Sequence, residues 1–179
     1  MPKVDLHQKA KTAEQKPSAI GPDINLASYA ARADEHEGIE RLKGLTPEVK
    51  ERANTVGIDA EEACRSGSFF QIDHSVIFSS ARQSGLEVMS TTEALEKYDW
   101  MKDYWWKAVP VDMDKYTAQA ELKQHQGYFL RALPGAKAEF PLQACLYMSK
   151  EGKWKAARSA HLVWGNFLIT CFIRSSSMP

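Results

Sequence analysis

Large and mainly polar residues alternate through the middle of the chain. From Phe70 to Phe78 the even positions carry mainly large side chains and the odd positions mainly polar ones. This period of two predicts one β-strand over residues 70–79. Residues 82–85 then predict a turn, and a second short strand begins at Leu86.

Two further strands are predicted nearer the end of the chain. They cover Tyr128–Leu133 and Lys137–Met148 and are joined by a turn at Pro134 and Gly135. Pro141 lies inside the second of these strands and has no N–H for a ladder hydrogen bond. It therefore favours an edge, a bend or a corner between two strands.

Helical signals occupy the segments before these strands. Asp23 or Asn25 is suited to cap a helix that runs to about Lys43. Thr46, followed by proline and glutamate, has the residue types of a helix start. That second helix is short, and Gly57 is suited to end it.

Two more helices are predicted between the strands. Ser90 and Glu93 have the spacing of a capping box, for a helix that runs to about Ala108. A short helix is expected over residues 114–122. Residues 1–22 are polar and contain three prolines, which predicts a disordered lead-in.

Composition limits the classes of function. The chain has 179 residues, 44% hydrophobic and 26% charged, which is typical of one globular domain with or without a tail. Its 23 acids and 23 bases give no net charge, which argues against nucleic-acid or anionic-membrane partners. It has no apolar run of about 20 residues and no secretory leader, and its three scattered cysteines predict no disulfide framework. We expect a cytoplasmic protein.

The charges are unevenly distributed along the chain. Residues 1–152 contain all 23 acids and 19 of the 23 bases, whereas residues 153–179 contain four bases and no acid. A basic surface strand or tail would account for this. The alternative is that the last segment has a different origin from the rest.

Few residues carry catalytic or metal-binding chemistry. His74 follows Asp73, but neighbours on a strand point to opposite faces, so a structural histidine is the favoured interpretation. His125 lies in a polar run and is expected to be solvated. His161 belongs to the acid-free segment, and the three histidines have no metal-ligand spacing.

The cysteines point to packing more than to reactivity. Cys145 lies in an apolar strand, where a thiol acts as a small hydrophobic group. Cys64 lies in a segment expected to be an exposed loop. The chain also lacks the glycine-rich phosphate-binding motifs and the nucleophile elbow. We therefore predict no catalytic residue, no metal ligand and no enzymatic activity.

An aromatic cluster is the most unusual feature of the composition. It consists of Tyr98, Trp100, Tyr104, Trp105 and Trp106. Stacking on nucleic-acid bases would need a basic groove, and the acids and lysines of this segment cancel. We expect one side of the cluster to lie in the core and the other to contact a neighbouring domain or partner.

Three stretches resemble the SufB/SufD family of iron–sulfur cluster assembly proteins. They are Ser66–Val76, Gly85–Asp112 and Gly127–Cys145, in the order and spacing of the family. The resemblance covers about residues 45–152. It implies an α+β fold in which an N-terminal helical region leads into the first rungs of a right-handed parallel β-helix.

The resemblance also implies domains and partners. Residues 23–126 would form the N-terminal helical, α+β domain, and residues 127–152 would begin the β-helix core. Family members scaffold nascent iron–sulfur clusters together with a SufC-type ABC ATPase and a second SufB/SufD-type subunit. The cluster is implied for the family only, and no residue here is assigned as its ligand. The alternative function is an interaction module without cluster chemistry of its own.

The resemblance ends where the charge pattern changes. After Gly152 the regular rungs of the family are replaced by the acid-free segment, residues 153–179. We interpret the chain as a truncated member whose last segment is read from a shifted frame, the alternative being a genuine short, divergent member. The ATPase-docking region would then be absent, and open rungs would favour self-association.

Overall fold

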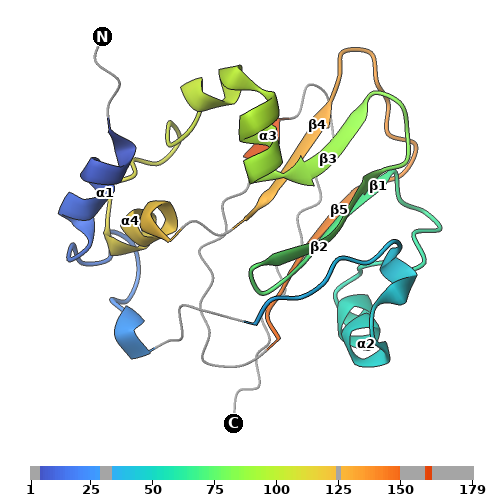
Figure 1. Ribbon diagram of the computed structural model, residues 1–179, viewed down its shortest axis with the longest axis horizontal. Helices are drawn as coiled ribbons and strands as arrows, with labels where there is room; N and C mark the ends of the chain where they lie inside the picture. Colours follow the sequence, from blue (N-terminus) through green and yellow to red (C-terminus); the bar gives the residue numbers. More distant parts are fainter. Residues whose placement is uncertain (1–4, 29–33, 124–125, 150–159, 163–179) are drawn as a thin grey trace.

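The computed structural model describes residues 5–28, 34–123 and 126–149, and residues 160–162 as a strand. Its strands form two three-stranded sheets, flanked by short helices (Figure 1). The strands are β1 (Gly67–Ile72), β2 (Ser75–Ala81), β3 (Leu86–Ser90), β4 (Tyr128–Ala132), β5 (Leu142–Tyr147) and β6 (Ala160–Leu162). The α-helices are α1 (Leu6–Ala13), α2 (Pro47–Thr55), α3 (Thr91–Lys97) and α4 (Lys115–Leu122), and the 3₁₀ helices are η1 (Leu26–Ser28), η2 (Leu42–Gly44) and η3 (Asp99–Asp103).

The two sheets follow the same plan. In the first sheet, β1 pairs antiparallel with β2 on one side and parallel with β5 on the other. In the second sheet, β4 pairs antiparallel with β3 and parallel with β6. Each sheet therefore has an antiparallel strand at one edge and a parallel strand at the other.

Adjacent phenylalanines of β1 build two separate cores. Phe70 packs with Leu42 and Cys145 on one face of the sheet. Phe69 points to the other face and packs between the two sheets, with its ring centroid 5.8 Å from that of Tyr128. Gly67 lets the sheets approach, because a Cβ there would lie only 3.0 Å from Val88 Cγ2.

Several local signals are confirmed. The Thr46 side chain caps α2, and Gly57 follows that helix with a φ of +84°. The Ser90 hydroxyl accepts a hydrogen bond from the Glu93 amide, while the Glu93 carboxylate accepts one from the Ser90 amide. Asp114 likewise caps α4, so the predicted helix over residues 114–122 is present.

The single strand predicted over residues 70–79 is wrong. The segment is a tight hairpin in which Ile72 pairs with Ser75 across a turn at Asp73 and His74. Asp73 has a φ of +48°, a left-handed conformation that aspartate tolerates better than most residues. A two-residue turn preserves the period of two, which is why the alternation did not reveal it.

The helix predicted from residue 23 to Lys43 is also wrong in the described parts. Only the two single-turn helices η1 and η2 form there, and residues 34–40, named the strap below, contain no helix. The Ile39 amide donates a hydrogen bond to the Ile77 carbonyl of β2, at 2.8 Å. Gly38 and the acidic residues around it favour this arrangement over a helix.

The described part of the predicted disordered lead-in is ordered. Helix α1 begins at a cap from Asp5 and packs against α4, with Ala10 and Ala13 fully buried. The polar composition hid this helix because its contact face is small, with Ala10 and Ala13 buried and Leu6 partly buried. Residues 1–4 lie outside the described part.

The long helix predicted to reach Ala108 ends early. Helix α3 stops at Lys97, because Tyr98 is extended and places its ring 5.8 Å from that of Phe129. The 3₁₀ helix η3 follows and buries Met101 against the same phenylalanine. Packing on the sheet thus replaces a continuous helical stripe.

The described residues combine helices with mixed sheets, an α+β arrangement, and the β-helix stays a prediction. The domain boundaries also stay predictions. Of the acid-free segment, only residues 160–162 fall within the described part. Among the described residues, none of the helices has the length and apolar character needed to span a bilayer.

Candidate functional site

A buried carboxylate lies at the turn between β1 and β2. Asp73 is only 3% exposed, and its carboxylate accepts hydrogen bonds from the Ser149 amide at 2.9 Å and the Ser149 hydroxyl at 2.6 Å. One of its oxygens also lies 3.2 Å from Nε2 of His36. The turn is therefore tied to the end of β5 and to the strap.

The histidine on this carboxylate is one that sequence reasoning missed. His36 lies 37 residues before Asp73, in a polar run that gives no local sign of the contact. Its amide also donates to the Ser75 hydroxyl at 3.0 Å. A carboxylate that orients an imidazole is a feature of many metal and catalytic sites. Here its evident effect is to fasten three segments together.

The sulfur atoms do not form a site within the described residues. Cys145 is fully buried in the Phe70 core, as the apolar strand predicts. Cys64 is exposed, also as expected. His125 lies outside the described residues, and His161 is described only as part of β6. Among the described residues, no group of three or more His, Cys, Asp or Glu side chains is placed to hold a metal ion.

The aromatic cluster divides between two parts of the molecule. Tyr98 and Trp100 pack on Phe129 of β4 and enclose the Arg131 guanidinium, whose carbon lies 5.0 and 5.3 Å from their ring centroids. Tyr104 extends the stack outward, with its centroid 6.0 Å from that of Trp100 and its side chain 67% exposed. The predicted core side is present, and Tyr104 is the exposed ring of the cluster. Contact of the other side with a domain or partner stays a prediction.

Trp106 belongs to the other part. Its indole N–H donates to the Glu121 carboxylate of α4 at 2.6 Å, and its ring packs beside the α1–α4 contact. It has a φ of +57°, which is unusual for so large a residue. The hydrogen bond and the packing hold it there.

Glu87 anchors the arginine and the aromatic rings. Its carboxylate accepts hydrogen bonds from the Tyr98 hydroxyl and from Lys97 Nζ, and Arg131 lies 3.5 Å away. Burial opposes ionisation of Glu87, but the two hydrogen bonds and the neighbouring cations outweigh it and lower the pKa of Glu87 below its ordinary value. The carboxylate therefore stays ionised and holds the cluster in one arrangement.

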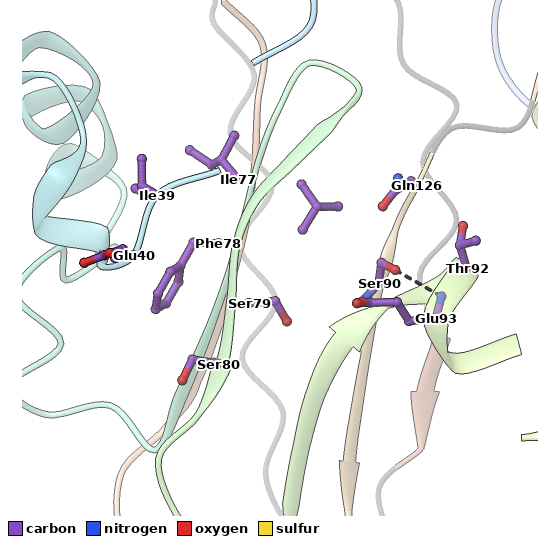
Figure 2. Close-up of a pocket in the computed structure, with 11 residues that line it drawn as sticks. Ile39, Glu40, Ile77, Phe78, Ser79, Ser80, Ser90, Thr92, Glu93 and Gln126 are labelled. Carbon is purple, nitrogen blue, oxygen red and sulfur yellow. Dashed lines mark hydrogen bonds between the residues drawn. The ribbon is translucent and has the colours of Figure 1, made fainter. Parts of the chain in front are cut away.

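An open groove of about 550 Å³ lies beside the outer edge of β2 (Figure 2). Its volume falls in the range of ligand-binding clefts. One wall consists of β2 and the end of the strap, and Ser90 and Glu93 lie on the opposite side (Figure 2). The Ser79 hydroxyl donates to the Val88 carbonyl of β3 at 2.8 Å. The lining residues are Ile39, Glu40, Val76, Ile77, Phe78, Ser79, Ser80, Ser90, Thr92, Glu93 and Gln126.

Comparison with known proteins gives consistent relatives. An "Iron-sulfur cluster assembly SufBD family protein" of Methanothermobacter thermautotrophicus strain Delta H is 42% identical over 162 residues, covering 88% of this chain and 39% of the relative. A homologue from strain Winter of that species is 39% identical over 160 residues, covering 87% of this chain and 39% of its own length. A SufBD family protein of Archaeoglobus fulgidus is 47% identical over 104 residues, covering 58% of this chain and 28% of the relative.

The extent of these matches bears on the resemblance seen in the sequence. The match to the strain Delta H protein covers 88% of the chain, more than residues 45–152 alone. The chain spans about two fifths of the length of the first two relatives. No protein-family model matches the chain.

Proposed function

This chain belongs to the SufBD family of iron–sulfur cluster assembly proteins, and we propose from that membership that it forms the N-terminal part of a scaffold for nascent clusters. The observation that carries the proposal is the 42% identity over 88% of the chain. The chain spans only 39% of that relative, so the activity of a whole SufBD protein is a proposal for this chain.

The strand pairing supports the proposed right-handed parallel β-helix. In a solenoid, each strand stacks parallel on the equivalent strand one turn earlier. Phe129 of β4 pairs with Ala160 of β6, 31 residues further along the chain, a spacing typical of solenoid repeats. The Pro134–Gly135 turn lies between β4 and β5, in the place of a corner between two faces of a rung. The antiparallel strands β2 and β3 would then cap the first rung.

The proposed partners follow from the family. They are a SufC-type ABC ATPase and a second SufB/SufD-type subunit, with the iron–sulfur cluster as cargo. The role is non-enzymatic and cytoplasmic in this proposal. No cluster ligand is assigned among the described residues, since Cys145 is enclosed in a core and Cys64 lies on a loop. Self-association through rung edges also stays a prediction.

A second candidate function is an interaction module without cluster chemistry. The exposed part of the aromatic cluster favours it, because Tyr104 lies at the outer end of a rigid stack of rings. Exposed aromatic rings held in one orientation are typical of contact surfaces between proteins.

Anaerobic reconstitution with ferrous iron and sulfide tests the scaffold proposal. We would mix the chain with the full-length SufB/SufD-type subunit of the same organism. We would then measure how much of the chain that subunit retains, the iron and sulfide content of the mixture, and its thiolate-to-iron absorption. We expect the chain to be retained and to raise the cluster content of the mixture, while the chain alone gains little or no cluster. A chain that is neither retained nor alters cluster content would contradict the proposal.

Two variants separate the candidate functions. Retention without any change in cluster content, abolished by Tyr104→Ala, would support the interaction module instead. Cys64→Ser removes the exposed thiol and should leave retention unchanged. If Cys64→Ser lost the bound iron without losing retention, the iron would be bound adventitiously at the Cys64 loop.

A further inference from the structure

The strap covers only one end of the outer edge of β2. Among the described residues, β2 is the edge strand of its sheet and pairs with β1 alone. The strap contacts this edge through the His36 amide to the Ser75 hydroxyl and the Ile39 amide to the Ile77 carbonyl. Beyond Ile77, no described residue adds a backbone hydrogen bond to it. Natural proteins usually cover such edges, because they template pairing with another chain.

The direction of the backbone groups identifies which residues face outward. The Arg82 amide donates to the Ser66 carbonyl, so Arg82 faces β1. Backbone groups alternate along an antiparallel strand, which turns Ser79 and Ala81 away from β1. The outward direction of the Ile77 carbonyl agrees with this alternation. Ser79 therefore offers its N–H and C=O on the groove side.

The groove has the dimensions of an extended peptide. Five consecutive residues of β2, from Val76 to Ser80, line it. At about 3.3 Å per residue, they span about 16 Å, enough for roughly five residues of a partner strand. The opposite wall, which includes Ser90, Thr92 and Gln126, offers polar side chains to that strand.

The charge of the groove selects the partner. Its lining residues include the acids Glu40 and Glu93 and no lysine, arginine or histidine. The Glu93 carboxylate is fixed by its bond from the Ser90 amide, so its charge is held at the start of α3. Glu40 and Glu93 lie on opposite sides of β2 (Figure 2), so an incoming strand with lysine or arginine would meet one negative charge on each side.

We propose that the outer edge of β2 beyond the strap binds an extended, lysine- or arginine-bearing protein segment, which adds to the sheet as a further strand. Main-chain hydrogen bonds at Ser79 and Ala81 would provide affinity, and Glu40 and Glu93 would provide selectivity. This inference does not rest on the proposed role in cluster assembly.

A labelled peptide of about eight residues, alternating valine and lysine, is the probe. We expect it to bind the full chain, to bind at least about tenfold more tightly than a valine–glutamate peptide, and to weaken with added salt. Hydrogen exchange should show new protection at the Ser79 and Ala81 amides. Equal binding of the two peptides, or no binding of the lysine peptide, would overturn the proposal.

Ser79→Pro tests the edge itself. Proline is tolerated where a strand N–H faces away from its sheet, but this change also removes the hydrogen bond from the Ser79 hydroxyl to the Val88 carbonyl of β3, at 2.8 Å. Thermal stability should therefore fall modestly, while lysine-peptide affinity falls about tenfold. Ser79→Ala, which loses the same hydroxyl but keeps the outward N–H, is the matched control and should bind within about twofold of the parent. A Ser79→Pro chain that folds and binds normally would overturn the assignment.

A second variant covers the case in which Ser79→Pro fails to fold. Glu40→Gln combined with Glu93→Gln removes both charges, and glutamine retains the capping box. It should abolish the preference for lysine over glutamate peptides, and a retained preference would overturn the proposal. The chain could instead form a dimer that Ser79→Pro abolishes. That result would show that the β2 edge pairs with a second copy of the chain, and it would overturn the proposal of a basic partner.

Discussion

The two sheets and the α1–α4 pair are held together by different means. Four of the aromatic side chains of the sheets are at most 1% exposed, namely Phe69, Phe70, Tyr128 and Phe129. The α1–α4 contact instead buries the alanines Ala10, Ala13 and Ala118, with Val111 beside them. Around those alanines lie polar contacts, such as Lys16 Nζ to the Asp112 carbonyl at 2.7 Å.

The difference predicts two levels of stability in one molecule. Burying a large apolar side chain contributes roughly 1.5–3 kcal/mol, whereas a buried alanine contributes much less. The larger apolar side chains of this contact, Leu6, Trp106 and Leu122, are only partly buried. The α1–α4 pair therefore depends more than the sheets do on caps and hydrogen bonds, each with a net contribution of about 1 kcal/mol. We expect it to open before the sheets do.

The largest effect is expected from removing an aromatic ring of β1. Phe70 is stacked on Tyr147 at 6.4 Å between ring centroids and packs against Leu42. Phe70→Ala should lower the free energy of unfolding by about 3–5 kcal/mol, because it leaves a cavity that the sheet cannot close. Urea denaturation measures this loss. Phe70→Leu, the matched control, should cost less than about 1.5 kcal/mol, and equal losses would show that the ring is not packed as described.

A smaller and local effect is expected at the cap of α4. The Asp114 carboxylate accepts from the Tyr116 and Thr117 amides at 2.9 Å and from the Ala19 amide at 3.2 Å. Asp114→Ala should cost about 1–2 kcal/mol, because those donors lose their acceptor. Hydrogen exchange should quicken in α1 and α4 and stay unchanged in β1.

A matched cap on a helix that packs against the second sheet sharpens this comparison. Ser90 caps α3 in the same manner. Ser90→Ala should cost a similar amount but quicken exchange at the start of α3 and not in α1. Exchange that rises throughout the molecule in both variants would show that the two parts do not open separately.

Local chemistry was readable from the sequence, and contacts between distant segments were not. Thr46, Ser90, Glu93 and Gly57 identify helix ends because their side chains, or the lack of one, act within a single turn. Asp73 gave no such signal, since its left-handed turn depends on a fold that holds its carboxylate. The alternation of period two crosses such a turn unchanged.

The candidate site was the least readable part. The His36–Asp73 contact joins segments 37 residues apart, and Arg131 is enclosed by rings about 30 residues before it. One sequence gives no register between such segments. It did identify the unusual aromatic composition, but not that Trp106 would bond to Glu121 while Tyr98 packs on a strand.

The smallest effect concerns pH and the same cap of α4. Burial opposes ionisation of Asp114, but the hydrogen bonds from Thr117, Ala19 and Tyr116 outweigh it and lower the pKa of Asp114 below its ordinary value. The folded state therefore binds this proton less readily than the unfolded state. The resulting stabilisation is complete above the unfolded pKa, about 4, and is lost as pH falls through the folded pKa.

Exchange of the α1 and α4 amides should accordingly quicken, relative to that of β1, from about pH 4 downward. The effect should be smaller than that of Asp114→Ala, because a protonated carboxyl still accepts a hydrogen bond. Asp114→Asn should remove most of the pH dependence. The remainder should disappear with Asp23→Asn, since the hydrogen bond from Lys115 of α4 lowers the pKa of Asp23 as well. Glu87 on β3 also has a lowered pKa, so acid should loosen the aromatic cluster of the second sheet as well, and β1 is therefore the reference strand. Exchange that quickens in β1 before α1 and α4 would reverse the ranking of the two regions.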